Sequence, residues 1–257
     1  MKLYLHYFSI HMKSMMQHKM SFFLTMIGQV IMTITAFFGI YFMFLRFHSV
    51  RDFTYQEVLL GYSVVLFSFS LAEMFARGFD TFASMISNGE FDRIMVRPRN
   101  EIFQVLATRI EFTRIGKFLQ ALFMMLYVFL TSDIQWNVYK VAVVVLMIAG
   151  GAALFSGLFL IYAAICFFST QGLEFMNIFT DGAREYGKYP VNIYGKRMLQ
   201  ICTFVVPYAL IQYYPLLYLL DRGKSVYALL PLAACLFMIP CLVLWKVGVK
   251  HYVSSGS

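Results

Sequence analysis

The sequence predicts an all-α membrane protein with six transmembrane helices, an N-terminal interfacial helix, a short cytoplasmic helix and re-entrant helices before the last span. The chain is 60% hydrophobic and 18% aromatic, and charged residues make up only 13%, against about 25% in soluble domains. Its 257 residues include several uncharged runs that approach or exceed the roughly 20 residues a helix needs to cross a bilayer. The whole chain, 1–257, is therefore expected to form one transmembrane domain.

Residues 1–20 are predicted to form an amphipathic helix, because apolar residues alternate there with lysines and histidines. Such a helix lies in the membrane interface. Residues 21–45 contain no charge and form the first predicted span, and residues 55–75 form the second, with Glu57 and Glu73 near its ends. No run of small residues marks a cleavage site, so we expect the N-terminal segment to stay in the protein.

Three further spans follow from apolar runs. Span three is predicted over residues 103–131 and span four over residues 139–166. Span four contains the stretch AGGAALFSG, whose small residues allow close contact between helices. The last span is predicted over residues 226–248. The first turns of span three are unusual because they carry the charged residues Arg109, Glu111, Arg114 and Lys117.

The region before the last span has two interpretations. In the first, the polar stretch TQGLEFMNIFTDGAREYGKYPVNIYGKR, residues 170–197, is a cytoplasmic loop and residues 198–220 form span five. In the second, residues 169–188 are a polar span shielded from lipid, and Pro207 and Pro215 break residues 191–222 into a re-entrant hairpin. A broken backbone at membrane depth requires protein or water around it. Both interpretations give six spans and leave both termini on one side.

Arginine and lysine are distributed unevenly among the polar segments. Residues 76–117 carry seven of them, whereas residues 46–54 carry two and residues 132–140 carry one. Cytoplasmic segments are enriched in these residues, so residues 76–117 and both termini are expected in the cytoplasm. The net charge of +8 fits this distribution. We expect no nucleic-acid partner, because no basic stripe stands on a soluble face.

The stretch NGEFDRIMVRPRN, residues 88–100, concentrates charge in an otherwise apolar chain. Its Asn-Gly pair favours a turn, and EFDRIMV can form a short helix with Phe91, Ile94 and Met95 on one side. The Arg-Pro pair ends that helix, because the residue before a proline avoids the helical region. A helix with an apolar side and a charged rim docks into a groove of a soluble partner, or it lies on the membrane surface.

Motifs of catalysis are missing from the sequence. It contains no GxxxxGK[ST] phosphate loop, no GxSxG and no HExxH. The four cysteines lie in apolar runs without zinc-site spacing. We therefore expect no cofactor and no metal in this chain, and no ATP hydrolysis by it.

Two stretches resemble ABC-2 type permeases, a branch of bacterial ABC exporter subunits often encoded beside an ATPase and a second permease. GEFDRIMVRPRNEIFQV resembles the pattern GELDxxLxRPxxxLxQ that follows the second span in this family. KYPVNIYGKRMLQICTFVVPYALIQYYPLLYLL resembles RYPxxIYPxxxxxxxxFxxPxxxxxYxPxxxLL. Gly195 stands where the second pattern usually has another proline, so the local backbone there is expected to differ. The resemblance covers nearly the whole chain.

The resemblance implies a permease subunit of an ATP-driven exporter in the bacterial cytoplasmic membrane. It would move a hydrophobic or amphiphilic compound outward, while separate ATPase subunits bind ATP and Mg. Residues 1–20 would be the connecting helix, and residues 84–97 the coupling helix on the ATPase. The chain after span five would form re-entrant helices on the outer side, which favours the second interpretation of residues 169–188. The permease would pair with a second copy or a sister permease in the lipid bilayer.

Two sets of candidate site residues follow from these hypotheses. Arg97 and Glu90 are the expected polar contacts with the ATPase, and Phe91 and Met95 are the expected anchors. The rival hypothesis is a membrane-embedded enzyme acting on lipid-linked substrates, whose only candidate site is residues 174–188. The complete ATPase-coupling set is Glu90, Phe91, Asp92, Arg93, Met95 and Arg97, and the candidate substrate path is Tyr41, Tyr62, Phe69, Glu174, Asp181, Arg184 and Glu185.

Overall fold

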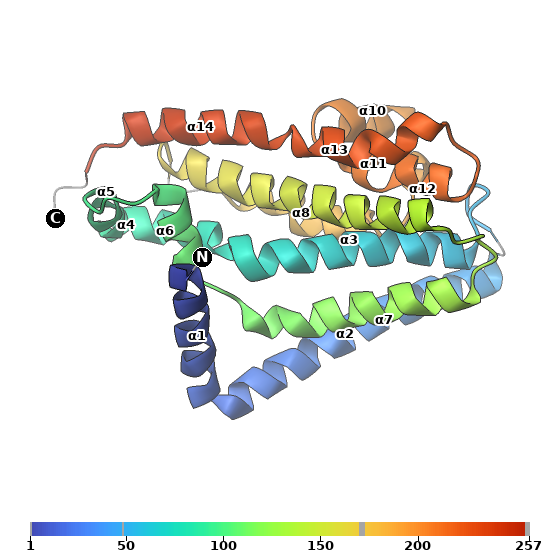
Figure 1. Cartoon of the computed structure of the whole chain (residues 1–257), viewed down its shortest axis with the longest axis horizontal. Coiled ribbons are helices and arrows are strands. Elements are labelled where there is room, and N and C mark those ends of the chain that lie inside the picture. Colours follow the sequence, from blue (N-terminus) through green and yellow to red (C-terminus); the bar gives the residue numbers. More distant parts are fainter. Residues whose placement is uncertain (1, 48, 170–172, 255–257) are drawn as a thin grey trace.

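Long helices running along one axis form the body of the molecule (Figure 1). The computed structural model describes residues 2–47, 49–169 and 173–254, and these residues form helices and loops without a β-strand. Helix α3 lies between α7 and α8 and contacts both, α14 packs on α8, and α2 packs obliquely on α7. The long helices are α2 (Lys19–Arg46), α3 (Tyr55–Ala76), α7 (Ile115–Thr131), α8 (Val138–Cys166) and α14 (Met238–His251).

Shorter helices gather at the two ends of this bundle. At one end α1 stands across the long helices beside α4, α5 and α6, and the first and last described residues lie at this same end (Figure 1). At the other end lie α10, α11 and α12. The bounds are α1 (Lys2–Gln17), α4 (Phe82–Ser87), α5 (Glu90–Met95), α6 (Glu101–Thr108), α10 (Lys196–Phe204), α11 (Tyr208–Ile211), α12 (Tyr213–Leu219) and α13 (Leu230–Cys235).

Local hydrogen bonds fix where the central helices begin. The Glu57 carboxylate accepts the backbone N–H of Thr54 at 2.9 Å, which satisfies a free donor at the start of α3. Arg222 also donates to Glu57 at 2.8 Å, so the loop after α12 is tied to the same point. At the start of α8 the Asn137 side chain accepts the N–H of Lys140 at 2.8 Å.

Five helical segments are long and apolar enough to cross a membrane, and a bent pair raises the number to six among the described residues. The five are Lys19–Arg46, Tyr55–Ser87, Phe112–Thr131, Val138–Cys166 and Ser225–His251. The last of these joins η5 (Ser225–Leu229), α13 and α14. The predicted class, an all-α membrane protein, is confirmed.

The bent pair consists of Lys196–Phe204 and Tyr208–Leu219, which meet at 83°. Pro207 stands at the break. Proline has no N–H to donate, and it disfavours the helical conformation in the residue before it. A single straight span over residues 198–220 is therefore absent from the structure.

The other candidate for span five is present only as short pieces. They are η3 (Leu173–Ile178) and α9 (Asp181–Tyr186), with η4 (Val191–Tyr194) following just after the predicted span. Residues 170–172 of the predicted segment lie outside the described part of the chain. Helix α9 contacts α3. Gln212 donates to the Gly187 carbonyl at 2.8 Å. Helix α9 and Gly187 thus lie against α3 and the α11–α12 junction, and the described residues of 169–188 form no single continuous helix.

The predicted span over residues 103–131 is interrupted, which is a correction. Helix α6 ends at Thr108, Arg109 is extended with φ −146°, and the membrane-crossing segment begins only with η2 (Phe112–Arg114). Between them the backbone N–H of Glu111 donates to Met74 of α3 at 3.1 Å. Arg109 and Glu111 thus leave the apolar helix and pair with each other at 2.6 Å.

Close helix contact at the small residues of α8 provides a test of the packing. A Cβ on Gly150 would lie 2.6 Å from the backbone oxygen of Pro231, whereas the same addition at Gly28 meets no described atom within 4 Å. Gly150→Ala should lower the free energy of unfolding by roughly 1–3 kcal/mol through overpacking, and Gly28→Ala should not. Denaturant titration in mixed micelles measures both. Equal stability of the two variants would contradict the packing of α13 on α8.

Candidate functional site

The turn between α4 and α5 forms as the Asn-Gly pair predicts. Helix α4 ends at Ser87, and Gly89 adopts the left-handed conformation with φ 67°, which glycine enters without steric cost. Helix α5 then runs for six residues, from Glu90 to Met95. Gln104 of α6 donates to the carbonyl oxygens of Ile94 and Arg99 at 3.1 and 3.0 Å, so α6 holds the chain that leaves α5.

Phe91 does not lie on the outer face of α5, which corrects the hypothesis that it anchors a partner. Its side chain is 0% exposed, and its ring contacts those of Phe82, Phe167, Trp245 and Tyr252 with centroids 5.1–6.2 Å apart. Burial of an aromatic ring releases ordered water and stabilises the fold. This cluster, Phe82, Phe91, Phe167, Trp245 and Tyr252, is called the aromatic cluster below.

Asp92 is also held within the chain. It accepts hydrogen bonds from the hydroxyls of Tyr252 at 3.0 Å and Ser254 at 2.7 Å, both just after α14. Burial raises the pKa of Tyr252 above its usual range, and the hydrogen bond to the Asp92 carboxylate raises it further. Helix α5 is therefore joined to the end of α14 by both a ring contact and these hydrogen bonds.

The remaining predicted coupling residues do face outward. Glu90, Arg93 and Arg97 are exposed. Met95 is 49% exposed, and Val96, which the sequence analysis did not select, is 83% exposed. The outer surface of this segment thus combines one apolar pair with three charges, and it is called the α5 outer face below.

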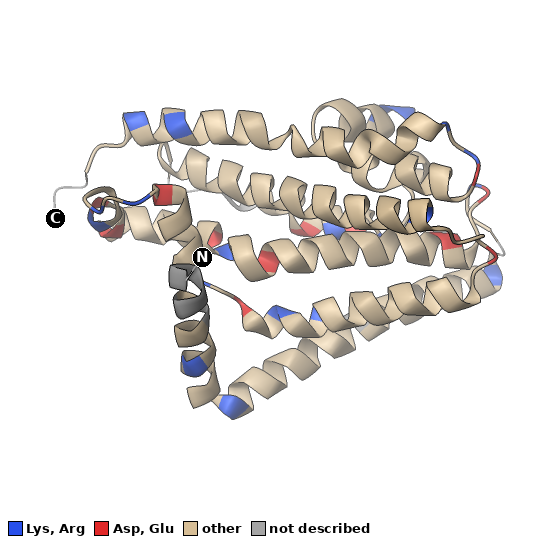
Figure 2. Cartoon of the chain, in the orientation of Figure 1, with Lys and Arg blue, Asp and Glu red and all other residues tan. Residues whose placement is uncertain are grey.

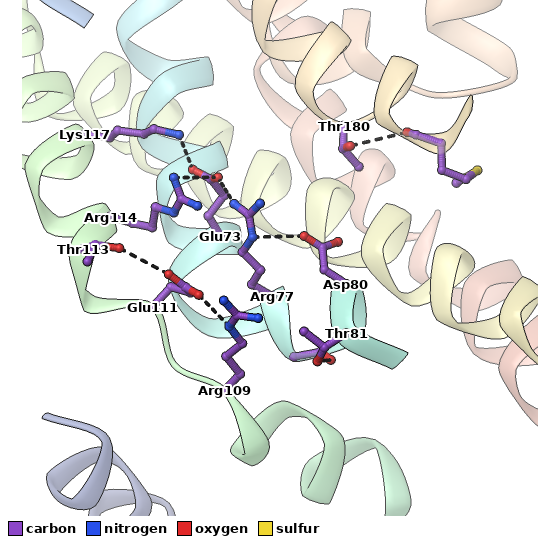
Figure 3. Close-up of polar contacts among 12 residues, drawn as sticks. Glu73, Arg77, Asp80, Thr81, Arg109, Glu111, Thr113, Arg114, Lys117 and Thr180 are labelled. Atoms are coloured by element: carbon purple, nitrogen blue, oxygen red, sulfur yellow. Dashed lines mark hydrogen bonds and ion pairs between the residues drawn. The ribbon is translucent and has the colours of Figure 1, made fainter. Parts of the chain in front are cut away.

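Charged groups also meet within the bundle (Figure 2). Glu73 of α3 is 1% exposed. It accepts from Lys117 at 2.8 Å and lies 3.5 Å from Arg114 (Figure 3). It also pairs with Arg77, the first residue of the short helix η1 (Arg77–Thr81) that follows α3. Arg77 in turn contacts Asp80 at 3.0 Å. Glu73, Arg77, Arg114 and Lys117 are called the Glu73 cluster.

Sequence reasoning did not predict the Glu73 cluster. Glu73 stands near the end of span two and several charges stand at the start of span three, but neither stretch alone shows that they meet. The C-terminal end of α3 and the N-terminal end of α7 lie side by side because the two helices are antiparallel. An acid at the first and bases at the second are the signal for such a cluster. In a low-dielectric interior such charges are stable only when paired.

A cavity of about 720 Å³ lies beside the Glu73 cluster. Residues of α2, α3, the start of α7 and the segment 184–189 line it. Of the predicted substrate path, Tyr62, Arg184 and Glu185 line this cavity. The full lining is Thr25, Gly28, Gln29, Met32, Thr35, Ala36, Gly39, Ile40, Tyr62, Leu66, Arg114, Lys117, Arg184, Glu185, Lys188 and Tyr189.

The other residues predicted for the path lie elsewhere. Tyr41 contacts Phe42 and Tyr55, with ring centroids 5.8 Å apart in each pair. Phe69 is buried, with the Lys117 ammonium 5.6 Å and the Arg184 guanidinium 5.7 Å from its ring centre. Asp181 is partly buried at the start of α9. The side chain of Glu174 falls outside what the structure describes.

The apolar spans and the ion pairs buried between them define a multi-pass membrane protein. The model of the family described as ABC-2 family transporter protein matches residues 30–256. The chain therefore belongs to the ABC-2 family and is a membrane permease of an ABC transporter, which is a non-enzymatic role. No curated protein and no solved structure matches the chain.

Two alanine substitutions test whether the Phe91 side chain stabilises the fold or is free to contact a partner. Phe91→Ala should lower the free energy of unfolding of the chain by roughly 3–5 kcal/mol, because it leaves a hole in the aromatic cluster. Met95→Ala removes an exposed side chain of the same helix and should change it by less than about 0.5 kcal/mol. Unfolding in mixed micelles measures both. Near-equal values would place the Phe91 ring outside the core.

The Glu73 cluster predicts a large effect of one neutralised acid. Glu73→Gln leaves buried cations without their shared counter-charge, so the free energy of unfolding should fall by roughly 3–5 kcal/mol. Asp133→Asn removes the same charge from an exposed loop position and serves as the control, expected within about 0.5 kcal/mol of the parent. A Glu73→Gln protein as stable as this control would rule out the cluster as a structural element.

Proposed function

We propose that the chain is the permease subunit of an ATP-driven exporter that moves a hydrophobic or amphiphilic compound outward across a bacterial cytoplasmic membrane. The observation that carries this proposal is membership of the ABC-2 family over residues 30–256. A separate ATPase subunit would bind ATP and Mg. A second copy or a sister permease would complete the membrane part, and the exposed apolar side chains along α2 leave room for it.

The orientation follows from charge. The α4–α6 end carries Arg93, Arg97 and Arg99 on its surface, and positively charged segments stay in the cytoplasm. This end also holds the first and last described residues (Figure 1). The α5 outer face would then lie on the cytoplasmic side, where a soluble ATPase can reach it.

The α5 outer face supports the coupling role. Met95 and Val96 offer an apolar contact, and Glu90, Arg93 and Arg97 surround it with charge. Interfaces of this kind have a buried centre and a polar rim. This arrangement replaces Phe91 with Val96 among the contacts proposed from the sequence and keeps Met95.

Force from the ATPase would reach the membrane spans through the residues behind this face. Phe91 lies against Trp245 of α14, and Phe82 packs on both. Asp92 adds its two hydrogen bonds to the end of the same span. Packed rings transmit displacement with little loss because protein interiors are dense and hardly compressible. ATP can shift the permease only by binding its two conformations with different free energies.

The cargo would enter the cavity beside the Glu73 cluster. Its volume of about 720 Å³ lies within the range of small-molecule sites. Tyr62 and Tyr189 offer both apolar surface and a hydroxyl, while α2 offers the apolar side chains of Met32 and Ile40 beside polar ones such as Gln29. A lining that combines charged, polar and apolar side chains suits an amphiphile better than an ion.

A substitution on the α5 outer face tests the exporter proposal. Arg97→Ala should weaken co-purification of the ATPase roughly 5- to 30-fold and reduce cargo-stimulated ATP hydrolysis in lipid, because a charged contact is lost. The control is Arg46→Ala, which removes the same charge at the C-terminal end of α2, at the end of the bundle opposite the α5 outer face (Figure 1). It should change neither quantity. The readouts are the ratio of ATPase to permease after purification and the rate of phosphate release.

Two results would contradict the proposal. One is a wild-type chain that retains no ATPase. The other is Arg97→Ala behaving like Arg46→Ala while both proteins remain folded.

A further inference from the structure

The cavity beside the Glu73 cluster has an excess of cations on its wall. Arg114, Lys117, Arg184 and Lys188 line it, and the only carboxylate among the described lining residues is Glu185. Behind the wall, Glu73 pairs with Arg114 and Lys117 but is also shared with Arg77. Asp181 interacts electrostatically with Arg114. With these acids included, the cations still outnumber the carboxylates.

Arg184 and Lys188 share a single acid, Glu185. The Glu185 carboxylate accepts a hydrogen bond from the Arg184 guanidinium at 2.9 Å and another from the Lys188 ammonium. One carboxylate carries one charge, so it neutralises only half of this pair of cations. Donor groups on Arg184 and Lys188 therefore remain available to a further acceptor, because guanidinium has five N–H donors and ammonium has three.

Arg184 lies against a membrane-crossing segment. Arg184 lies over the ring of Phe69, 5.7 Å from its centre, and Phe69 is in the interior of span α3. A charge held inside a membrane span is costly, and it marks a ligand or transport pathway by default. Within residues 184–188, two cations share one acid at this place.

Helix α2 forms the opposite wall of the cavity and brings no charge to it. It contributes the apolar Met32, Ala36 and Ile40, the glycines Gly28 and Gly39, and the uncharged polar residues Thr25, Gln29 and Thr35. No described atom lies within 4 Å of a Cβ built on either glycine. The cavity thus has a cationic side formed by Arg114, Lys117 and residues 184–188, and an uncharged side along α2 on which apolar side chains accompany a few polar ones. An ion alone would use only the first of these sides.

We propose that this cavity binds the anionic oxygen group, a phosphate or a carboxylate, of an amphiphile, with Arg184 and Lys188 as its principal contacts. This proposal rests on the proposed exporter function and names the polar end of its cargo. The guanidinium fork matches the geometry of phosphate and carboxylate oxygens. Arg114 and Lys117 add positive potential from the neighbouring wall, and the hydrocarbon part of the amphiphile lies along α2.

The test measures binding of radiolabelled dodecyl phosphate to the full chain in phosphatidylcholine nanodiscs, without ATP, after subtraction of empty nanodiscs. Arg184→Gln/Lys188→Gln should weaken binding roughly tenfold or more. Lys196→Gln/Arg197→Gln is the matched control, because it removes the same two residue types from exposed positions outside the cavity. Its affinity should stay within about twofold of the parent.

A second variant distinguishes recognition from loss of structure. Glu185→Gln removes the carboxylate that competes with the ligand for Arg184 and Lys188, so dodecyl phosphate should bind about threefold tighter or more. A change that only damaged the fold would weaken binding instead. Weaker or unchanged binding by this variant would overturn the assignment.

Two competitors decide the ligand chemistry. Neutral dodecyl maltoside should not displace dodecyl phosphate, and displacement by it at equal concentration would overturn the anion site. Inorganic phosphate should compete only weakly, which assigns the site to a membrane amphiphile. Equal competition by inorganic phosphate keeps the anion site but overturns the amphiphile. Binding requires no ATPase, so these outcomes are independent of the Arg97→Ala experiment and the exporter proposal can stand or fall separately.

Discussion

A charge inside an apolar bundle is stable only when opposite charge lies against it, and Glu73 provides that charge for three cations at once. Through Lys117 and Arg114 it joins α3 to the start of α7, and through Arg77 it fixes the point where α3 passes into η1. The break between α6 and α7 lies nearby. Two of the same cations, Arg114 and Lys117, also line the cavity. The shape of the polar region thus depends on one acid.

The aromatic cluster organises the other end of the molecule. Rings from α4, α5, α8's C-terminal cap and α14 meet around Trp245, which is fully buried. A six-residue helix has too few internal hydrogen bonds to be stable alone. Helix α5 exists because Phe91 and Ile94 are buried and because its ends are held by Gly89, Gln104 and the residues after α14. This anchoring makes α5 a rigid part of the bundle.

Much of the fold could be predicted because a bilayer imposes a length on every apolar run. The extents of α3 and α8, the turn at Gly89 and the break at Pro207 follow from composition or from single residues. The ion pair between Lys117 and Glu73 joins residues 44 positions apart, and no local pattern gives that pairing. The inward direction of Phe91 was also missed, since helical periodicity groups residues on a face without stating which face is buried.

Folding and the proposed partner contact involve different side chains of α5. The side chains at positions 91 and 94 are buried, whereas those at positions 90, 93 and 95 are exposed on the surface. Substitutions at the outward positions meet no packing constraint from the chain itself. Under the proposed coupling role, recognition of a partner would therefore diverge in evolution while the bundle stays intact. Duplicated copies of such a gene would change partner through a few substitutions on the outward side of α5, without passing through a sequence that fails to fold.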